Sequence, residues 1–447
     1  MRTSAKLTAV VGATVLALSI ARHQGSLDAQ PTEPVFTKDV APILYKNCAS
    51  CHRPGGLGPF SLLDYDSAKA NVADIKDAVK TGYMPPWHAE GPHGTFRNDR
   101  RLSELEKATI IRWIDGGAKR GDAQAMPAQP VFPAGWEMGT PDAVVTMKEE
   151  FTVPAAGTIE YQYFEVPTGF AEDKWVKAIE IMPGARDVVH HVLVYARPPA
   201  PAAPATPAAP GVTPTPAPRL FVNKPQYAMP KPAPRTDSIH GPPSSMGTLI
   251  GTTAPGTNML TMPEGTAMRV RAGTVLVFQM HYTAHGHERH DRTSVGFRFA
   301  PAAPGEEMRA AAFANGALVL PAGAKNVEVP SELEPTDTIT VWGLFPHTHL
   351  RGTRWKYTLE KPDGTSEIVL DVPRYDFNWQ TYYFFTKPLK ITPGSKLKAV
   401  AWYDNSATNP HNPDPKIDVK WGDQTWEEMQ YTGFLYTVNS RRLTPAK

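Results

Sequence analysis

From about Gly135 onward, apolar and polar residues alternate in short runs rich in Val, Thr, Tyr and Phe. A period of two places the apolar side chains of a strand on one face, and Pro and Gly break these runs at intervals typical of antiparallel sandwiches. We predict strands at 159–166, 176–181, 188–195, 275–282, 338–345, 355–359 and 397–403. The pattern predicts an all-β region without a clean internal repeat.

The residues before this region follow a helical pattern. Ser103 and Glu106 have the spacing of a capping box, and Ile110, Trp113 and Ile114 supply an apolar stripe. Helices are therefore predicted at 37–47, 66–81 and 103–117. The Ala- and Pro-rich run at 123–134 then indicates a linker. These observations divide the chain into a small all-α domain at 31–122, the linker, and the β region.

Composition narrows the function classes. The chain has 447 residues, enough for two or three domains, and a formal net charge of +2 without a basic cluster, so nucleic acid is not an expected partner. Its 46 prolines are about twice the average usage and favour strands and turns. The Ala-, Pro- and Thr-rich insertion at 197–219 cannot bury a core, which predicts a disordered or polyproline-like surface loop. A contact surface for the helical domain is the alternative.

The first 30 residues have the pattern of an export signal. Arg2 and Lys6 precede an apolar run at 7–20 that is too short to span a bilayer. Cleavage is possible after Ala21 or Ala29, and an uncleaved anchor is the alternative. We expect a periplasmic or extracellular protein with no integral membrane span after signal cleavage.

The two cysteines of the chain both lie in Cys48-Ala49-Ser50-Cys51-His52, the attachment pattern of c-type haem. Each thiol can add to a haem vinyl group, and His52 is then the proximal iron ligand. A redox dithiol is the alternative, since no second cysteine pair exists to complete a zinc site. The motif predicts one covalently bound haem c.

The second axial ligand is expected in the proline-braced stretch Tyr83-Met84-Pro85-Pro86-Trp87. Met84 is the preferred candidate, because a Met/His pair raises the haem potential and suits electron transfer. His88 and His93 are the competing candidates. The span from Val35 to Gly121 resembles a small α-helical cytochrome c domain, and Met84 stands where such domains carry their axial Met.

Histidines mark the ends of several predicted strands. His347 and His349 follow the run at 338–345, and side chains two apart on a strand project from the same face. A lone His-x-His pair is a weak metal signal, but three further sites accompany it: His190 with His191, then His281, and finally Met429.

Between Phe132 and Tyr436 the motifs follow one another as His-His at 190–191, His-Tyr at 281–282, His-Thr-His at 347–349 and Glu-Met at 428–429. In this order they resemble the motifs of the copper type II, ascorbate-dependent monooxygenase family. The resemblance implies two all-β antiparallel sandwich (jelly-roll-like) copper domains, at 135–300 and 301–447. It implies two copper ions. The first is held by His190, His191 and His281, and the second, where dioxygen binds and catalysis occurs, by His347, His349 and Met429.

Ligand chemistry and strand geometry bear on both implied sites. Two imidazoles with a thioether suit copper, since zinc and iron rarely recruit Met. Adjacent side chains on a regular strand point to opposite faces, so His190 and His191 need a local bulge or different ring nitrogens to share one ion. The alternative is that one of them is an ordinary core or surface histidine.

The resemblance implies hydroxylation of a C–H bond in a small organic substrate, which the sequence does not identify. Electrons would reach copper through the fused haem from an exported redox donor or an ascorbate-like reductant. The peptide-amidating branch holds its substrate with an Arg and a Tyr where this chain has Phe345 and Gly433, so a peptidylglycine substrate is not expected. The rival hypothesis is a non-oxygenating haem-copper electron-transfer or copper-binding protein.

Simpler roles are expected for the remaining histidines and for four aromatic residues. His285, His287 and His290 fall in a charged, glycine-containing loop and should be solvated, while His240 and His411 lie in Pro- and Gly-rich loops. Four aromatic residues are candidates to line an apolar pocket, although buried core is the simpler role: Phe345, Trp379, Tyr382 and Tyr431.

Overall fold

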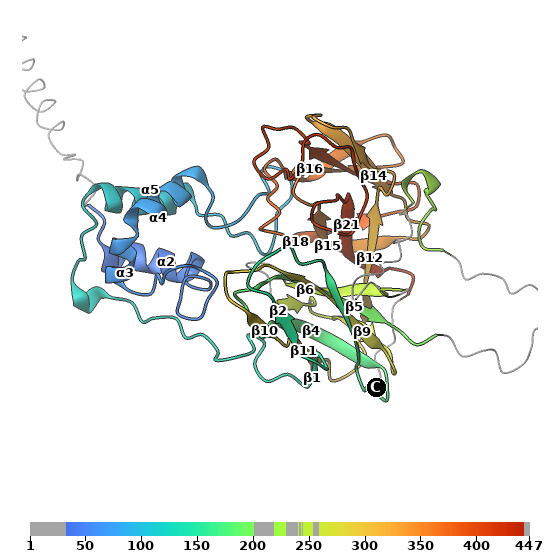
Figure 1. The fold of residues 1–447 in the computed structure, drawn as a ribbon, viewed down its shortest axis with the longest axis horizontal. Coiled ribbons are helices and arrows are strands. Elements are labelled where there is room, and N and C mark those ends of the chain that lie inside the picture. Colours follow the sequence, from blue (N-terminus) through green and yellow to red (C-terminus); the bar gives the residue numbers. More distant parts are fainter. Residues whose placement is uncertain are drawn as a thin grey trace, which may run out of the picture. The chain divides into compact units, whose positions relative to one another are not determined.

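The computed structural model describes residues 33–200, 219–228, 240, 243, 245–253 and 259–441. The predicted export signal and most of the insertion at 197–219 lie outside these residues. The chain forms two compact units (Figure 1), of which the first comprises Met1–Pro54, Phe60–Thr81 and Leu102–Gln129, and the second Gly55–Pro59, Gly82–Arg101 and Pro130–Lys447. Within the described ranges, no helix combines the length and apolarity needed to cross a bilayer.

The first unit is helical, and all three predicted helices are present. The second one is interrupted at Asn71, and the third begins after Ser103, whose side chain forms the predicted capping box with Glu106. Phe36, Leu44 and Trp113 are among the buried residues of its core. Its elements are η1 (Phe36–Val40), α2 (Ala41–Asn47), α3 (Tyr65–Ala70), α4 (Val72–Thr81), α5 (Glu104–Asp115) and η2 (Ala123–Ala125).

The regular secondary structure of the second unit consists almost entirely of strands, and each of the seven predicted strands is found in it. Beside its strands it contains the short helix η3 (Pro225–Tyr227). The strands are β1 (Ala143–Thr146), β2 (Phe151–Val153), β3 (Gln162–Pro167), β4 (Lys174–Met182), β5 (Val189–Arg197), β6 (Thr248–Thr253), β7 (Met259–Thr261), β8 (Thr266–Val270), β9 (Val275–Tyr282), β10 (Arg289–Asp291), β11 (Ser294–Phe299), β12 (Glu306–Ala314), β13 (Val319–Leu320), β14 (Val327–Leu333), β15 (Ile339–His347), β16 (Gly352–Glu360), β17 (Ser366–Val372), β18 (Tyr383–Ile391), β19 (Lys396–Tyr403), β20 (Val419–Lys420) and β21 (Tyr431–Val438).

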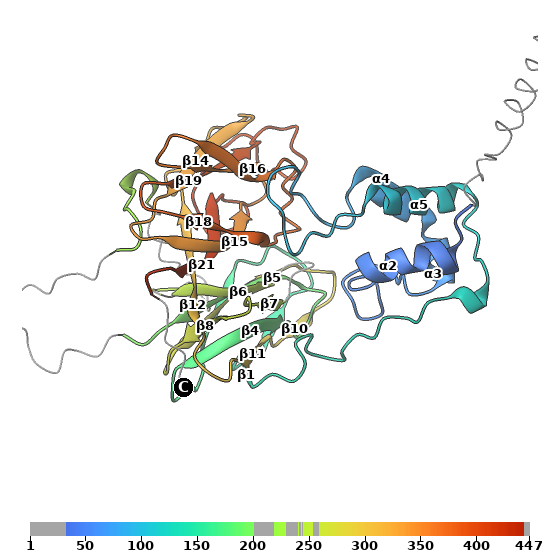
Figure 2. The same ribbon diagram turned by 180° about the vertical axis from the view of Figure 1, so that it is seen from behind.

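One long sheet runs through both halves of this unit. Its order is β1-β11-β4-β8-β12-β21-β15-β18, with β7 also paired to β4. A four-stranded sheet, β3-β9-β5-β6, accompanies the first half, and another, β14-β19-β16-β17, accompanies the second (Figure 2). The sequence pattern predicted antiparallel pairing, but β12 pairs parallel with β8 before it pairs antiparallel with β21. The predicted junction near residue 300 is therefore crossed by a continuous sheet.

Two apolar cores fill the spaces between these sheets. The first collects side chains such as Ile179, Val192 and Phe278 from β4, β5 and β9. The second contains side chains such as Val341, Trp355 and Ala401 from β15, β16 and β19. Apolar burial of this kind, at roughly 25 cal/mol per Å², is the main force that holds sandwiches together. Both cores reach the region between the halves, where the candidate site lies.

The segment Gly82–Arg101 leaves the helical stretch of the sequence and packs on the second half of the β unit. Phe96 forms a β-bridge with Phe385, and the Arg97 N–H donates to the Phe384 carbonyl at 2.8 Å. Trp87 and Phe96 are buried in the second core. Met84 thus belongs to the β unit, although the sequence pattern had placed 31–122 in one domain. The two large aromatic side chains explain the difference, because the core of the sandwich buries them.

Candidate metal centres

The first histidine cluster lies where β5 and β9 run side by side. The register of this pair shifts between Val189 and His191, which leaves His190 in a bulge. The bulge is the first of the two solutions expected for adjacent histidines, and it turns both rings to one side. The Nδ1 atom of His191 lies 3.0 Å from that of His190 and 3.2 Å from that of His281. Three imidazoles with suitable ligand atoms therefore converge.

Neighbouring polar groups determine which nitrogens of the cluster carry protons. The Asn378 amide nitrogen donates to Asp376, so its Oδ1 faces His190 Nε2 at 3.3 Å and must accept from it. The Thr425 hydroxyl donates to Tyr161 and lies 3.4 Å from His281 Nε2, from which it accepts. The Nδ1 atoms of His190 and His281 then carry no proton, and their lone pairs point toward the centre of the cluster.

Two inward lone pairs that meet a third imidazole nitrogen match a cation better than a hydrogen-bond network. His191 Nδ1 can donate one proton at most, so it cannot satisfy both of its neighbours. Nitrogens about 2 Å from one ion would lie roughly 3.3 to 3.5 Å apart, close to the observed separations. Burial lowers the pKa of His281 to about 3 and the pKa of His191 well below its usual value. The rings are thus neutral, the form that binds metal.

The second cluster sits where β15 ends and just before β21 begins. His347 pairs with Tyr431 in the antiparallel register. Beyond this pair, the backbone N–H groups of His349 and Met429 both donate to the Glu428 carboxylate, so the three ligand candidates lie at one end of the sheet. His347 and His349 are buried, with ring centroids 5.2 Å apart.

Hydrogen bonds set the tautomers of this pair as well. The Gln380 amide nitrogen donates to the Phe377 carbonyl, so its Oε1 accepts from His347 Nδ1 at 2.7 Å. His349 Nδ1 donates to the Glu427 carbonyl at 3.1 Å, and its buried Nε2 has no hydrogen-bond partner among the described residues. Burial lowers the pKa of His347 to about 4. A donor Nδ1 with an Nε2 lone pair left over is the usual arrangement of a metal-binding imidazole.

A buried carboxylate connects the ligand candidates of the second cluster. Glu428 is fully buried and accepts from the backbone N–H groups of His349 at 2.8 Å and Arg351 at 2.6 Å. Burial raises the pKa of Glu428 to about 7, against the effect of these donors. Arg351 is also fully buried, and it donates to Asn405 at 2.8 Å. Sequence reasoning missed this network, because contacts between distant polar residues have no periodic signature.

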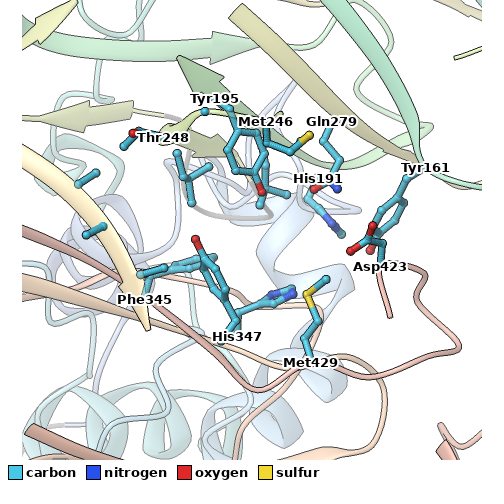
Figure 3. Close-up of a pocket in the computed structure, with 18 of the residues that line it drawn as sticks. Tyr161, His191, Tyr195, Met246, Thr248, Gln279, Phe345, His347, Asp423 and Met429 are labelled. Atoms are coloured by element: carbon cyan, nitrogen blue, oxygen red, sulfur yellow. The ribbon is translucent and has the colours of Figure 1, made fainter. Parts of the chain in front are cut away.

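One histidine of the first cluster, His191, and all three ligand candidates of the second line a cavity of about 470 Å³. Figure 3 shows His191 on one side, with Tyr161 and Tyr195, and His347 and Met429 on the other. Three of the four aromatic residues predicted to line a pocket do so: Phe345, Tyr382 and Tyr431. Trp379 does not, and its ring meets Tyr83 at 6.4 Å. The described lining residues include neither Lys nor Arg.

The haem-attachment motif lies at the end of α2 in the helical unit. Cys48 and Cys51 are free thiols, and burial raises the pKa of Cys48 to about 12. His52 Nδ1 lies 3.1 Å from the Phe60 carbonyl, to which it donates, so Nε2 remains as the ligand atom. Met84 belongs to the other unit, and the His52/Met84 pair stays a prediction. Of its competitors, His88 has a buried Nε2 without a hydrogen-bond partner among the described residues.

The remaining histidines mostly occupy the positions expected of them. His285, His287 and His290 are exposed, as predicted, and His290 lies near two glutamates. His411, for which only a loop position was predicted, is exposed as well. His240 differs, because its ring packs on Phe164 with centroids 4.4 Å apart. None of these five belongs to the clusters described above.

No family model and no curated protein matches the chain. Solved structures match it weakly. A fucolectin from striped bass (Morone saxatilis) serum has 8% identity, covers 65% of this chain and 85% of its own, and has a TM-score of 0.16. A putative secreted protein from Eubacterium rectale has 8% identity, 62% and 68% coverage, and a TM-score of 0.19. An allantoicase has 8% identity, 57% and 79% coverage, and a TM-score of 0.16. Similarity at this level carries no argument about function.

Proposed function

We propose that the chain is an exported copper-dependent monooxygenase, which hydroxylates a C–H bond of a small organic substrate with dioxygen and receives electrons through a c-type haem. One observation carries the proposal. The histidines fall into two separate clusters, and members of both, His191 on one side and His347, His349 and Met429 on the other, line one cavity.

The donor sets fit the two proposed copper ions. His190, His191 and His281 would hold one, and His347, His349 and Met429 the other. When bound, copper at these positions would supply one-electron redox chemistry and, at the three-ligand site containing Met429, activation of dioxygen. Four of the five imidazoles are kept in one tautomer by neighbouring groups: Asn378 and Thr425 do so for His190 and His281, and Gln380 and the Glu427 carbonyl for His347 and His349.

The cavity supports a substrate that is uncharged or weakly polar. Its aromatic lining would exclude water from the reacting carbon and orient a flat or aliphatic molecule by contact. Phe345 and Gly433 line it where the peptide-amidating branch carries its Arg and Tyr, so a terminal carboxylate would find no cationic partner among the described lining residues. These features favour a neutral organic substrate over a peptide.

The helical unit supports the haem part of the proposal. Cys48 and Cys51 are free thiols on one turn, and His52 is held by the Phe60 carbonyl with Nε2 available. One haem c attached there, with Met84 as second ligand, would pass electrons from an exported redox donor or an ascorbate-like reductant.

Metal analysis and gas binding test the proposal. Matured protein should contain two coppers and one haem iron per chain, and one of the reduced coppers should bind carbon monoxide. Incubation with ¹⁸O₂, reductant and a panel of neutral organic compounds should yield ¹⁸O-labelled alcohol. Two coppers without carbon monoxide binding or product would favour the electron-transfer alternative, and an absence of copper would overturn both.

A further inference from the structure

We infer that Phe377, in the loop between β17 and β18, is the medium through which an electron passes from the three-histidine metal to the metal at His347, His349 and Met429. The inference rests on the proposed function. It concerns how the chain connects the two centres, which the resemblance to copper monooxygenases does not address.

The Phe377 ring contacts both histidine clusters. Its centroid lies 5.5 Å from that of His190, with the rings stacked at 15°. It also lies 6.1 Å from the centroid of His349, at 81°. The centroids of His190 and His349 are therefore no farther apart than the sum of 5.5 and 6.1 Å, which is 11.6 Å. The Phe377 side chain is buried, so packed protein atoms occupy this route.

The residues after Phe377 hold one histidine of each cluster. Asn378 accepts from His190 Nε2 at 3.3 Å, and Gln380 accepts from His347 Nδ1 at 2.7 Å. Asp376 in turn accepts from the backbone and side-chain nitrogens of Asn378, at 2.8 and 3.0 Å. A single short segment thus fixes the distance and orientation of both clusters relative to the ring. Asn378 and Gln380 are positioning residues in this arrangement.

The competing route crosses the cavity. His191, His347 and His349 line it, but Phe377 is not among its lining residues. Electronic coupling decays faster across open space or mobile solvent than through packed atoms in contact, which favours the ring. With copper bound, the step would transfer one electron: the ion held by His190, His191 and His281 would go from Cu(I) to Cu(II), and the ion held by His347, His349 and Met429 from Cu(II) to Cu(I). No bond forms or breaks, and no proton moves.

Redistribution of one electron between the two coppers tests this route without a substrate. Anaerobic, copper-loaded protein receives less than one equivalent of a photogenerated reductant, and freeze-quench EPR follows the two Cu(II) signals with time. The Phe377→Leu variant should slow redistribution, because it removes the ring that contacts both His190 and His349. Phe377→Tyr, which keeps the ring, and Lys387→Ala, an exposed change on β18, should leave the rate unchanged.

Each outcome decides the inference. Redistribution at the wild-type rate in Phe377→Leu, with both Cu(II) spectra intact, would overturn it in favour of the cavity. If Phe377→Leu loses copper, Phe377→Met replaces it, and a wild-type rate in that variant has the same meaning. Wild-type protein with fewer than two coppers would refute the proposed function itself, which separates the two failures.

Discussion

The two histidine clusters are built in different ways. The first consists of side chains from neighbouring strands of one sheet, and its His190 and His281 remain partly exposed. The second is buried, and its parts come from the end of β15 and the residues before β21, tied together by Glu428. Backbone pairing brings the histidines of the first cluster together, with side-chain hydrogen bonds from Asn378 and Thr425, whereas the second depends on a buried polar network. The first should therefore tolerate substitutions around it better than the second.

Removal of one ligand from the second cluster should have the largest effect. We expect His349→Ala to lower the copper content from two per chain to one, and to reduce oxygen consumption by more than about 100-fold, beyond the range of outer-shell substitutions. Mass spectrometry of bound metal and an oxygen electrode measure both. His285→Ala, in an exposed loop, is the control. Two retained coppers in His349→Ala would contradict the assignment.

Removing the buried Arg351 guanidinium should destabilise the fold. Arg351→Met removes its hydrogen bonds to Asn405 and to the Trp426 carbonyl, and it removes the nearby positive charge that favours the buried Glu428 carboxylate. The free energy of unfolding should fall by about 1 to 3 kcal/mol. Urea denaturation measures this change. The double variant Arg351→Met/Glu428→Gln should recover part of the loss, because no uncompensated charge remains buried. A double variant less stable than the single one would show that packing, and not charge, dominates.

Acid should destabilise the metal-free protein through its buried histidines. Burial places the folded-state pKa of His281 at about 3 and that of His347 at about 4. Because these values lie below the unfolded pKa near 6.5, the unfolded chain binds more protons, and stability is lost as the pH falls below 6.5. The expected loss is about 2 kcal/mol per such histidine between pH 6.5 and 5.

Glu428 acts in the opposite sense. Its folded pKa of about 7 lies above the unfolded value, so its contribution to stability is present at low pH and is lost as the pH rises toward 7. The stability that this one carboxyl group gains as the pH falls is smaller than the stability that the several buried histidines lose. Urea midpoints measured between pH 7 and 5 should therefore fall for the apo-protein, and His347→Gln should make the fall shallower. A stability independent of pH in this window would contradict the neutral, buried state of the rings.

The smallest effects on copper binding should come from the loss of side chains that hydrogen-bond to the histidine rings. Gln380→Ala removes the 2.7 Å acceptor of His347, and copper affinity at the second cluster should fall about tenfold. Thr425→Val removes a contact of 3.4 Å to His281, so the first cluster should change less. Competition with a copper chelator measures both affinities. A larger loss for Thr425→Val than for Gln380→Ala would reverse the proposed ranking.

Local patterns predicted much of the fold. The seven alternating runs became strands, the three helical stretches became helices, and the capping box at Ser103 formed as expected. Period-two alternation and caps depend on neighbours in the sequence, so one chain is enough to read them. The bulge at His190 is one of the two alternatives that strand geometry allowed for adjacent histidines.

The rest depends on pairing between distant segments. His349 and Met429 meet because β15 and β21 share a register, which alternation cannot specify. Arg351 and Phe377 gave no local signal for burial beside the ligands, and Trp87 and Phe96 gave none for packing on the β unit. The parallel pairing of β8 and β12 was equally invisible. In each case tertiary contact, and not local preference, decided the outcome.

The position of β12 has a mechanical consequence. This strand pairs with β8 of the first half and with β21 of the second, so the two halves of the unit share it. A hinge motion that separates the two halves would break backbone hydrogen bonds of this sheet, because no flexible linker joins the halves at this strand. A molecule that enters or leaves the cavity would then do so by displacement of side chains and loops at its mouth, while the spacing of the two histidine clusters stays constant.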